Sequence, residues 1–271
     1  MKVTKAVMTL MILIFCVSVS AFSEEKLPEN QMNVKKRLVK VAGDPYPPWT
    51  IGAAGSKPTG GIAVEIVEEL FRRLNLKTRV IIYPLKRGLQ RIKDGDEDVV
   101  LMVSESKERE KYMLFTHSIS HVRFVFYYPA TLQNFEWREW KDLQPYMIGS
   151  VTGYNYGKDW KDAVKNYNLR IEEVKTDVFN IDKLLLDRID IILTDHENMQ
   201  ELIQQNPRYQ GKFKWHKKPV FESVNNFGVS KKSFLVPMIP KINKVLQEMK
   251  DDGTFRKIFC AHKKSFRGSC E

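Results

Sequence analysis

The sequence predicts an α/β fold of two lobes that are joined by two crossings of the chain. Short apolar strands alternate with amphipathic helices along most of the sequence, which is typical of βαβ units with largely parallel sheets. Two extended runs interrupt this alternation and fall between groups of βα units. The length of 271 residues also favours a chain of about two domains.

The individual elements follow from local patterns of apolar residues. Five segments have the short apolar pattern of β-strands: residues 79–83, 98–102, 147–151, 169–174 and 189–194. Four segments carry apolar residues at the 3.6-residue spacing of helices: 63–74, 85–92, 181–185 and 238–250. Asp252-Gly253 is a stop signal for the last of these helices.

The two extended runs are residues 124–129 and 222–230, and they are the candidate crossings. We therefore expect residues 37–126 together with 227–271 to form one lobe, and residues 127–226 to form the other. The C-terminal segment then returns to the first lobe.

The first 23 residues have the pattern of a secretory signal peptide. Lys2 and Lys5 form a positive start, residues 6–23 carry no charge, and Ala21 or Ser23 supplies the small residue before the cleavage site. The alternative is a single membrane anchor, for which the apolar run is short. We expect export to the periplasm, with residues 24–36 as an N-terminal linker.

Composition and motifs exclude several classes of function. Apolar residues make up 43% and charged residues 28%, which is typical of a globular protein rather than a disordered or polytopic membrane protein. The net charge of +11 is spread over scattered doublets, so we expect a solvated basic surface and no nucleic-acid partner. No phosphate-binding loop, dinucleotide fingerprint, nucleophile elbow or zinc helix occurs, and we expect no cofactor and no metal.

Five motifs in order resemble those of the bacterial extracytoplasmic solute-binding proteins of family 3. They lie at residues 43–50 (with Gly61 and Glu65), 98–109 (with Phe115 and Thr116), 143–157, 189–195 and 252–258. The resemblance implies the type II periplasmic binding protein fold, with a ligand held between the lobes by hinge closure. It also implies a binding protein rather than an enzyme, which works as a monomer and delivers a small solute to an ABC permease.

The resemblance implies roles for two charged residues. Arg109 is expected to open a helix just after a strand, where its planar guanidinium can hold a ligand carboxylate through two hydrogen bonds. The alternative is a surface arginine that pairs with Glu105 or Glu108. Asp195 corresponds to the acid that holds an α-amino group in the family, and its alternative role is a helix N-cap.

Further residues complete the predicted ligand site. Tyr46 and Trp49 are candidates for an aromatic wall, with core packing as the alternative. Tyr154, Asn155 and Tyr156 are expected at a helix N-terminus that faces the cleft, with a simple cap and surface turn as the alternative. The full predicted set is Tyr46, Trp49, Leu85, Arg87, Ser104, Arg109, Tyr154, Asn155, Tyr156 and Asp195.

The sequence also departs from the amino-acid-binding pattern. Leu101 and Met102 stand where relatives have small polar groups, so that only Ser104 is polar there, and Leu85 and Arg87 replace an aromatic clamp. The carboxylate half of the site is therefore better supported than the ammonium half. The ligand is expected to be a small polar solute that bears a carboxylate, such as an amino acid. Two alternatives remain open, a ligand-sensing receptor subunit and a dehydratase-like enzyme of the same fold.

Signal cleavage would leave two cysteines, Cys260 and Cys270, in an oxidising compartment. We predict that they form a disulfide, which would close a short loop and stabilise the protein by ~2–3 kcal/mol on a loop-entropy argument. Thiol titration of the denatured, unreduced mature protein should detect no free cysteine. The alternative of two independent thiols would give two titratable groups.

Overall fold

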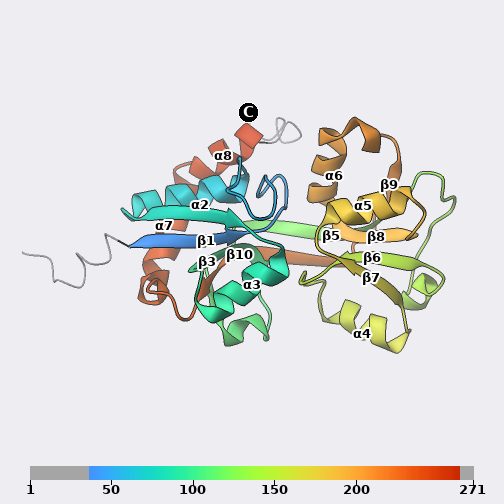
Figure 1. Cartoon of the computed structure of the whole chain (residues 1–271), viewed down its shortest axis with the longest axis horizontal. Helices are drawn as coiled ribbons and strands as arrows, with labels where there is room; N and C mark the ends of the chain where they lie inside the picture. Colours follow the sequence, from blue (N-terminus) through green and yellow to red (C-terminus); the bar gives the residue numbers. More distant parts are fainter. Residues whose placement is uncertain (1–36, 263–271) are drawn as a thin grey trace, which may run out of the picture.

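The structure is a computed structural model that describes residues 37–262. The chain forms two α/β lobes that lie side by side along the long axis of the molecule (Figure 1). One mixed sheet runs through both lobes in the order β2-β1-β3-β10-β5-β8-β6-β7. The predicted signal peptide, the predicted linker and Cys270 lie outside the described residues.

The first lobe is built on three parallel strands, in which β1 pairs with both β2 and β3. Its strands are β1 (Leu38–Gly43), β2 (Lys77–Ile82), β3 (Val99–Ser104) and the short β4 (Met113–Phe115). Its helices are α2 (Ile62–Arg73), α3 (Leu85–Asp94), α7 (Ile239–Asp251) and α8 (Thr254–His262), with 3-10 turns at η1 (Arg109–Lys111) and η4 (Val236–Met238). The last two helices therefore return to the lobe that contains β1.

The second lobe repeats this arrangement, with β6 parallel to both β7 and β8. Its strands are β6 (Met147–Val151), β7 (Arg170–Val174), β8 (Ile191–Asp195) and the short β9 (Phe213–Trp215). Its helices are α4 (Lys158–Asn166), α5 (Asp177–Leu185) and α6 (His196–Gln205), with 3-10 turns at η2 (Trp140–Leu143) and η3 (Pro207–Tyr209). Every strand and helix predicted above is present, with ends shifted by four residues or fewer.

Two long strands, β5 (Ser120–Pro129) and β10 (Phe221–Ser230), carry the chain between the lobes. They are antiparallel neighbours, paired from Phe221 opposite Phe124 to Asn225 opposite Ser120. β10 also pairs with β3 of the first lobe, and β5 also pairs with β8 of the second lobe. The predicted α/β fold of two lobes with two crossings is therefore confirmed.

The main clusters of buried apolar residues also belong to one lobe or the other. The largest buried cluster contains residues between 39 and 119 and between 227 and 259, whereas two other clusters contain residues between 122 and 221. Ile119 packs in the first of these cores and Val122 in the second, so we propose that the chain changes lobe between them. This point lies a few residues before the predicted boundary at 126, because the start of β5 already packs on the second lobe. We propose that the return crossing lies between Phe221 and Phe227, since Phe221 packs on the second core and Phe227 belongs to the first.

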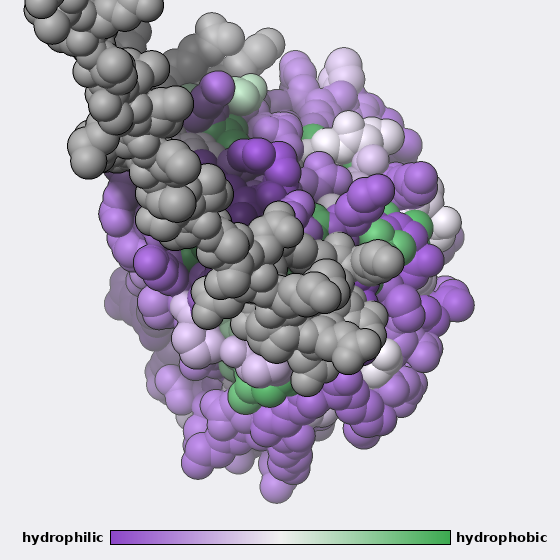
Figure 2. Space-filling model, turned by 90° about the vertical axis from the view of Figure 1, so that its left-hand side faces the viewer, coloured by the Kyte–Doolittle hydropathy of each residue, from purple (hydrophilic) through white to green (hydrophobic). Residues whose placement is uncertain are grey.

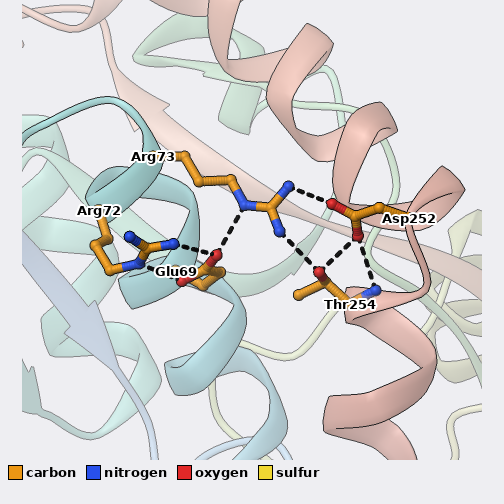
Figure 3. Close-up of polar contacts among 5 residues, drawn as sticks. All are labelled: Glu69, Arg72, Arg73, Asp252 and Thr254. Atoms are coloured by element: carbon orange, nitrogen blue, oxygen red, sulfur yellow. Dashed lines mark hydrogen bonds and ion pairs between the residues drawn. The ribbon is translucent and has the colours of Figure 1, made fainter.

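An ion-pair network ties the returning C-terminal helices to α2 (Figure 3). Arg73 donates to Glu69 at 2.8 Å, to Asp252 at 2.6 Å and to the hydroxyl of Thr254 at 2.7 Å. Asp252 in turn accepts from the backbone N–H of Thr254 at 2.9 Å, at the start of α8. Hydrogen bonds from Thr254 and Arg73 hold the pKa of Asp252 down to about 2. The motif at 252–258 thus has a structural role, since it joins α7 and α8 and anchors both to α2.

Where described residues are visible in Figure 2, they are mostly hydrophilic, with apolar side chains in small separate areas. Within residues 37–262, no helix combines the length and the apolar character that a membrane crossing requires.

The loop that carries Tyr46 and Trp49 is fixed against the start of α2. The N–H groups of Ile62 and Ala63 donate to the carbonyls of Pro48 and Trp49, each at 3.0 Å. Gly61 precedes the helix with φ of 132°, and a Cβ at this position would lie 2.4 Å from the carbonyl oxygen of Trp49. Only glycine satisfies both the backbone conformation and the close approach.

We predict that Gly61→Ala destabilises the folded protein by roughly 2 kcal/mol or more, because it combines a strained backbone with a steric clash. Gly60→Ala is the matched control, since a Cβ at Gly60 would meet no atom within 4 Å. Urea unfolding of both variants measures the difference. Equal midpoints for the two variants would contradict this account of Gly61.

Candidate functional site

A cavity lies between the lobes, and its lining comes from both of them. The lining residues are Asp44, Tyr46, Leu85, Met102, Ser104, Arg109, Phe124, Tyr154, Asn155 and Asn225. A wider opening adjoins it between α3 and the loop after β6, and the two share Arg109, Tyr154 and Asn155. Six of the ten predicted ligand-site residues line the inner cavity: Tyr46, Leu85, Ser104, Arg109, Tyr154 and Asn155.

Arg109 is a buried cation whose side chain joins the two lobes. Its side chain donates to the backbone carbonyl of Ser104 at 2.7 Å, to the Ser104 hydroxyl at 3.2 Å and to the carbonyl of Gly153 at 2.9 Å. The residue is 6% exposed and makes no ion pair within residues 37–262. It begins the three-residue turn η1, rather than the α-helix that we expected. Burial lowers the pKa of its guanidinium, so a ligand anion at this point would relieve an unpaired buried charge.

Asp195 takes the role of a helix N-cap, which was the alternative to its predicted ligand contact. It is fully buried at the end of β8 and caps α6, with acceptor contacts from the N–H groups of Glu197 at 3.3 Å and Asn198 at 3.4 Å. It also accepts a hydrogen bond at 2.8 Å from the hydroxyl of Tyr46, across the lobe boundary. Asp195 does not line the cavity, whereas Tyr46, which donates to it, does.

Two further carboxylates were missed in the sequence: Asp44, which lines the cavity, and Asp177, which lies outside the lining but contacts the lining residue Tyr154. The hydroxyl of Tyr154 lies 3.5 Å from Asp44 and 3.4 Å from Asp177. Asp177 also accepts at 2.8 Å from both Thr194 and Asn198. Asp44 directly follows β1 within the first motif, and this position at a strand end was a usable signal. Asp177 is the first residue of α5, and acidic residues are common in the first turn of a helix. The sequence therefore gave no reason to assign Asp177 to the site.

Burial raises the pKa of all three acids above the ordinary value of 3.8. The pKa of Asp44 reaches about 7, because of burial first and the nearby charge of Asp177 second. Burial raises the pKa of Asp177 and of Asp195 to about 6. The lobe boundary therefore holds carboxyl groups whose ionised forms are unfavourable without an additional cation.

Met102 enters the cavity through an irregularity in its strand. The pairing of β3 with β10 shifts register between Asn226 and Gly228, and Met102 has φ of 52°, which is unusual for a residue with a side chain. Such bulges redirect side chains near binding sites. The residue that replaces a small polar group of the family thus gives the cavity an apolar wall.

Three predicted site residues lie away from the cavity. Trp49 is 2% exposed and packs against Phe259 in the first core, because its loop folds onto α2. Tyr156 is buried in the second core, where its hydroxyl accepts from the N–H of Val151 at 2.8 Å. Arg87 is exposed on α3, with its guanidinium 5.8 Å from the centre of the Tyr83 ring. Within residues 37–262, no group of three or more histidine, cysteine or acidic side chains is placed to hold a metal ion.

Comparison with protein families identifies the class of protein that this fold and site define. Residues 39–263 match the family described as bacterial extracellular solute-binding proteins, family 3, and the chain belongs to this family. A comparison with curated proteins gives no match.

Many solved structures share the fold. An ancestral arginine-binding protein bound to arginine is 21% identical, with a TM-score of 0.72 over 83% of this chain and 97% of that one. The substrate-binding protein of an amino acid ABC transporter is 16% identical, with a TM-score of 0.71 over 84% of this chain and 100% of that one. A histidine kinase sensor domain with similarity to periplasmic binding proteins is also 16% identical, with a TM-score of 0.71 over 84% of this chain and 96% of that one. At these identities the likeness establishes the fold, which is that of type II periplasmic binding proteins.

The raised pKa of Asp44 predicts a pH dependence of stability. A carboxyl group with a raised pKa stabilises the folded state at low pH, and this contribution is lost as the pH rises through its folded value of about 7. Without ligand, the wild type should therefore lose roughly 3 °C or more of thermal stability relative to Asp44→Asn between pH ~5 and pH ~8.

Thermal melts of the two proteins across this pH range provide the measurement. Asp159→Asn is the matched control, since Asp159 is exposed on α4, and its curve should follow that of the wild type. Parallel curves for the wild type and Asp44→Asn would contradict the raised pKa.

Proposed function

We propose that the protein is a periplasmic solute-binding protein that captures an amino acid, or a similar small solute with a carboxylate, and delivers it to an ABC importer. The family supports a small-molecule ligand and an ABC permease as partner. One of the solved relatives is the binding protein of an amino acid transporter. We further propose that the protein acts as a monomer and has no enzymatic activity.

The observation that carries this proposal is the buried, unpaired guanidinium of Arg109. A planar guanidinium suits a carboxylate, because two parallel N–H groups can donate to its two oxygens. In the structure the guanidinium is held by carbonyl and hydroxyl oxygens, which are neutral. A ligand carboxylate that replaces the Gly153 carbonyl as acceptor would neutralise the charge and keep its donors satisfied.

Contacts between the lobes support capture by hinge closure. Tyr46 of the first lobe donates to Asp195 of the second, and Asn155 of the second lobe donates to Ser104 of the first at 3.1 Å. Arg109 adds a third link through Gly153. Because the residues that line the cavity are those that link the lobes, a ligand among them shifts the balance between open and closed forms by its different affinity for each.

A sensory role is the second candidate. The histidine kinase sensor domain has the same fold at nearly the same TM-score as the transport protein. Uptake of labelled ligand by cells that lack the gene separates the two roles, since loss of uptake supports transport and normal uptake supports sensing.

We predict that Arg109→Ala weakens binding of a carboxylate ligand by roughly 100- to 4,000-fold, because truncation leaves a buried carboxylate without its partner at a cost of ~3–5 kcal/mol. Arg109→Lys should recover only part of the affinity, since an ammonium group lacks the planar fork. The ligand comes from a thermal-shift screen of amino acids, organic acids and polyamines, and calorimetry gives the affinities.

Arg87→Ala is the control for this experiment. Arg87 belongs to the sequence-predicted site but is exposed and does not line the cavity, so its truncation should leave the affinity unchanged. Unchanged affinity in Arg109→Ala would contradict the proposal that Arg109 holds a carboxylate of the ligand.

A further inference from the structure

We propose that the segment between Cys260 and Cys270 forms a strap across the boundary between the lobes, in which the side chain of Phe266 docks into an apolar groove lined by both lobes. The strap holds the lobes together before any ligand binds. This inference concerns the hinge and does not depend on the identity of the ligand.

The groove has a volume of about 180 Å³ and lies between the loop after β1 and the helices α5 and α6. Its lining residues are Pro45, Pro47, Ile51, Gly52, Asp177, Val178, Leu202 and Gln205. The first four belong to the first lobe and the last four to the second. An apolar cavity of about 150 Å³ can hold benzene, so the groove has room for one aromatic ring.

The groove is separate from the wider opening beside Arg109. Figure 1 shows α5 and α6 on the upper side of the second lobe, and α3, which borders the wider opening, on the lower side of the first. The two sets of lining residues share no member. An occupant of the groove would therefore leave the wider opening free.

The second lobe exposes large apolar side chains at this groove. Val178 lines it and is 39% exposed, and the next residue of α5, Phe179, is 53% exposed. Most large apolar side chains of the described residues are buried or half-buried. Exposed apolar residues beside an apolar groove indicate a surface that another segment or molecule covers.

The described chain ends close to this groove. His262, the last residue of α8, contacts Glu65 in the first turn of α2. One turn earlier, the ring of Phe259 packs against Trp49 with 5.5 Å between the ring centres. Trp49 lies two residues after Pro47, which lines the groove. The chain therefore leaves α8 beside the first-lobe wall of the groove.

The residues that follow α8 have the chemistry and the reach to enter the groove. Phe266 is the only large apolar residue between Cys260 and Cys270. The predicted disulfide would close this segment into a loop, with Phe266 four residues from Cys270 and six from Cys260. Four extended residues span roughly 14 Å, so the loop can carry the ring from the end of α8 to the groove.

The charges of the two partners are also complementary. Lys263, Lys264 and Arg267 lie on both sides of Phe266 in the sequence. Asp177 is the charged member of the groove lining. A docked ring therefore brings cations toward an acidic residue, which favours the strap over an uncharged or acidic partner.

Docking at this place couples the strap to the position of the lobes. The groove has walls from both lobes, so it exists in full only when they lie together as in the structure. A segment that binds the complete groove more tightly than its separated halves shifts the hinge toward the closed form. Asp177 also contacts Tyr154, which lines the ligand cavity, at 3.4 Å. The strap and the ligand would thus favour the same arrangement of the lobes.

Limited trypsin digestion of the ligand-free mature chain, with its disulfides intact, tests the docking. Trypsin cuts after Arg267, and cleavage follows the population of the undocked loop. Phe266→Ala should speed this cut by roughly tenfold or more, and Phe266→Leu should keep part of the protection. A peptide of residues 261–269 corrects for the effect of each substitution on trypsin itself.

A pair of variants on the second lobe makes the test independent of the cleaved sequence. Val178→Gln places a longer polar side chain in the groove and should speed the cut after Arg267 by roughly fivefold or more. Leu186→Gln is the matched control, because Leu186 is 58% exposed just after α5 and does not line the groove. Its cleavage rate should equal that of the wild type. Thermal melts confirm that each variant is folded.

X-ray scattering of the ligand-free proteins tests the effect on the hinge. The radius of gyration of Phe266→Ala should exceed that of the wild type, because loss of the strap lets the lobes separate. Equal radii would overturn the strap, and so would equal cleavage rates for the wild type and either Phe266→Ala or Val178→Gln. Protection that rises with protein concentration would also overturn it, since a second copy of the chain would then cover the groove.

Discussion

The arrangement of the two lobes depends on buried polar groups that find their partners across the lobe boundary. The guanidinium of Arg109 starts in the first lobe and reaches a carbonyl of the second, and the carboxylate of Asp195 receives its donor from Tyr46 of the first. A buried polar group that loses its partner destabilises the folded state by its full desolvation energy, which is about 1–3 kcal/mol and more for a charge. The same atoms therefore set the position of the lobes and the chemistry of the cavity.

The sheet explains why these groups meet. Parallel strands bring their carboxyl ends to one edge, and Asp44, Ser104 and Asp195 each lie at or just after such an end. Between the two parallel groups lie β5 and β10, which are antiparallel to each other and turn the two edges toward one another. Asn225 lies on one of these strands, so the connection between the lobes is itself part of the cavity wall.

Much of this organisation could be predicted from the sequence, because it rests on local patterns. Apolar periodicity located the strands and helices, and the two extended runs identified the crossings. The residues of the site were harder to predict than the elements of the fold. Arg109 and Tyr46 belong to recognisable motifs, whereas Asp177 and Asn225 come from segments that look like a helix cap and an extended strand. Trp49 and Tyr156 were assigned to the site because aromatic residues suit both a ligand wall and a core, and only the tertiary packing decides between them.

The return of the chain to the first lobe also determines the order in which the protein can be completed. The core of the first lobe includes Phe227, Leu246 and Phe255, and the contacts of Arg73 with Asp252 and Thr254 bind α2 to the last helices. During synthesis, β1 and α2 therefore complete their packing only after α7 and α8 have been made. The second lobe is continuous in sequence and has no such requirement, so it can fold while the first lobe is still incomplete. A nascent chain would thus expose the apolar side of α2 until α7 and α8 are available to cover it.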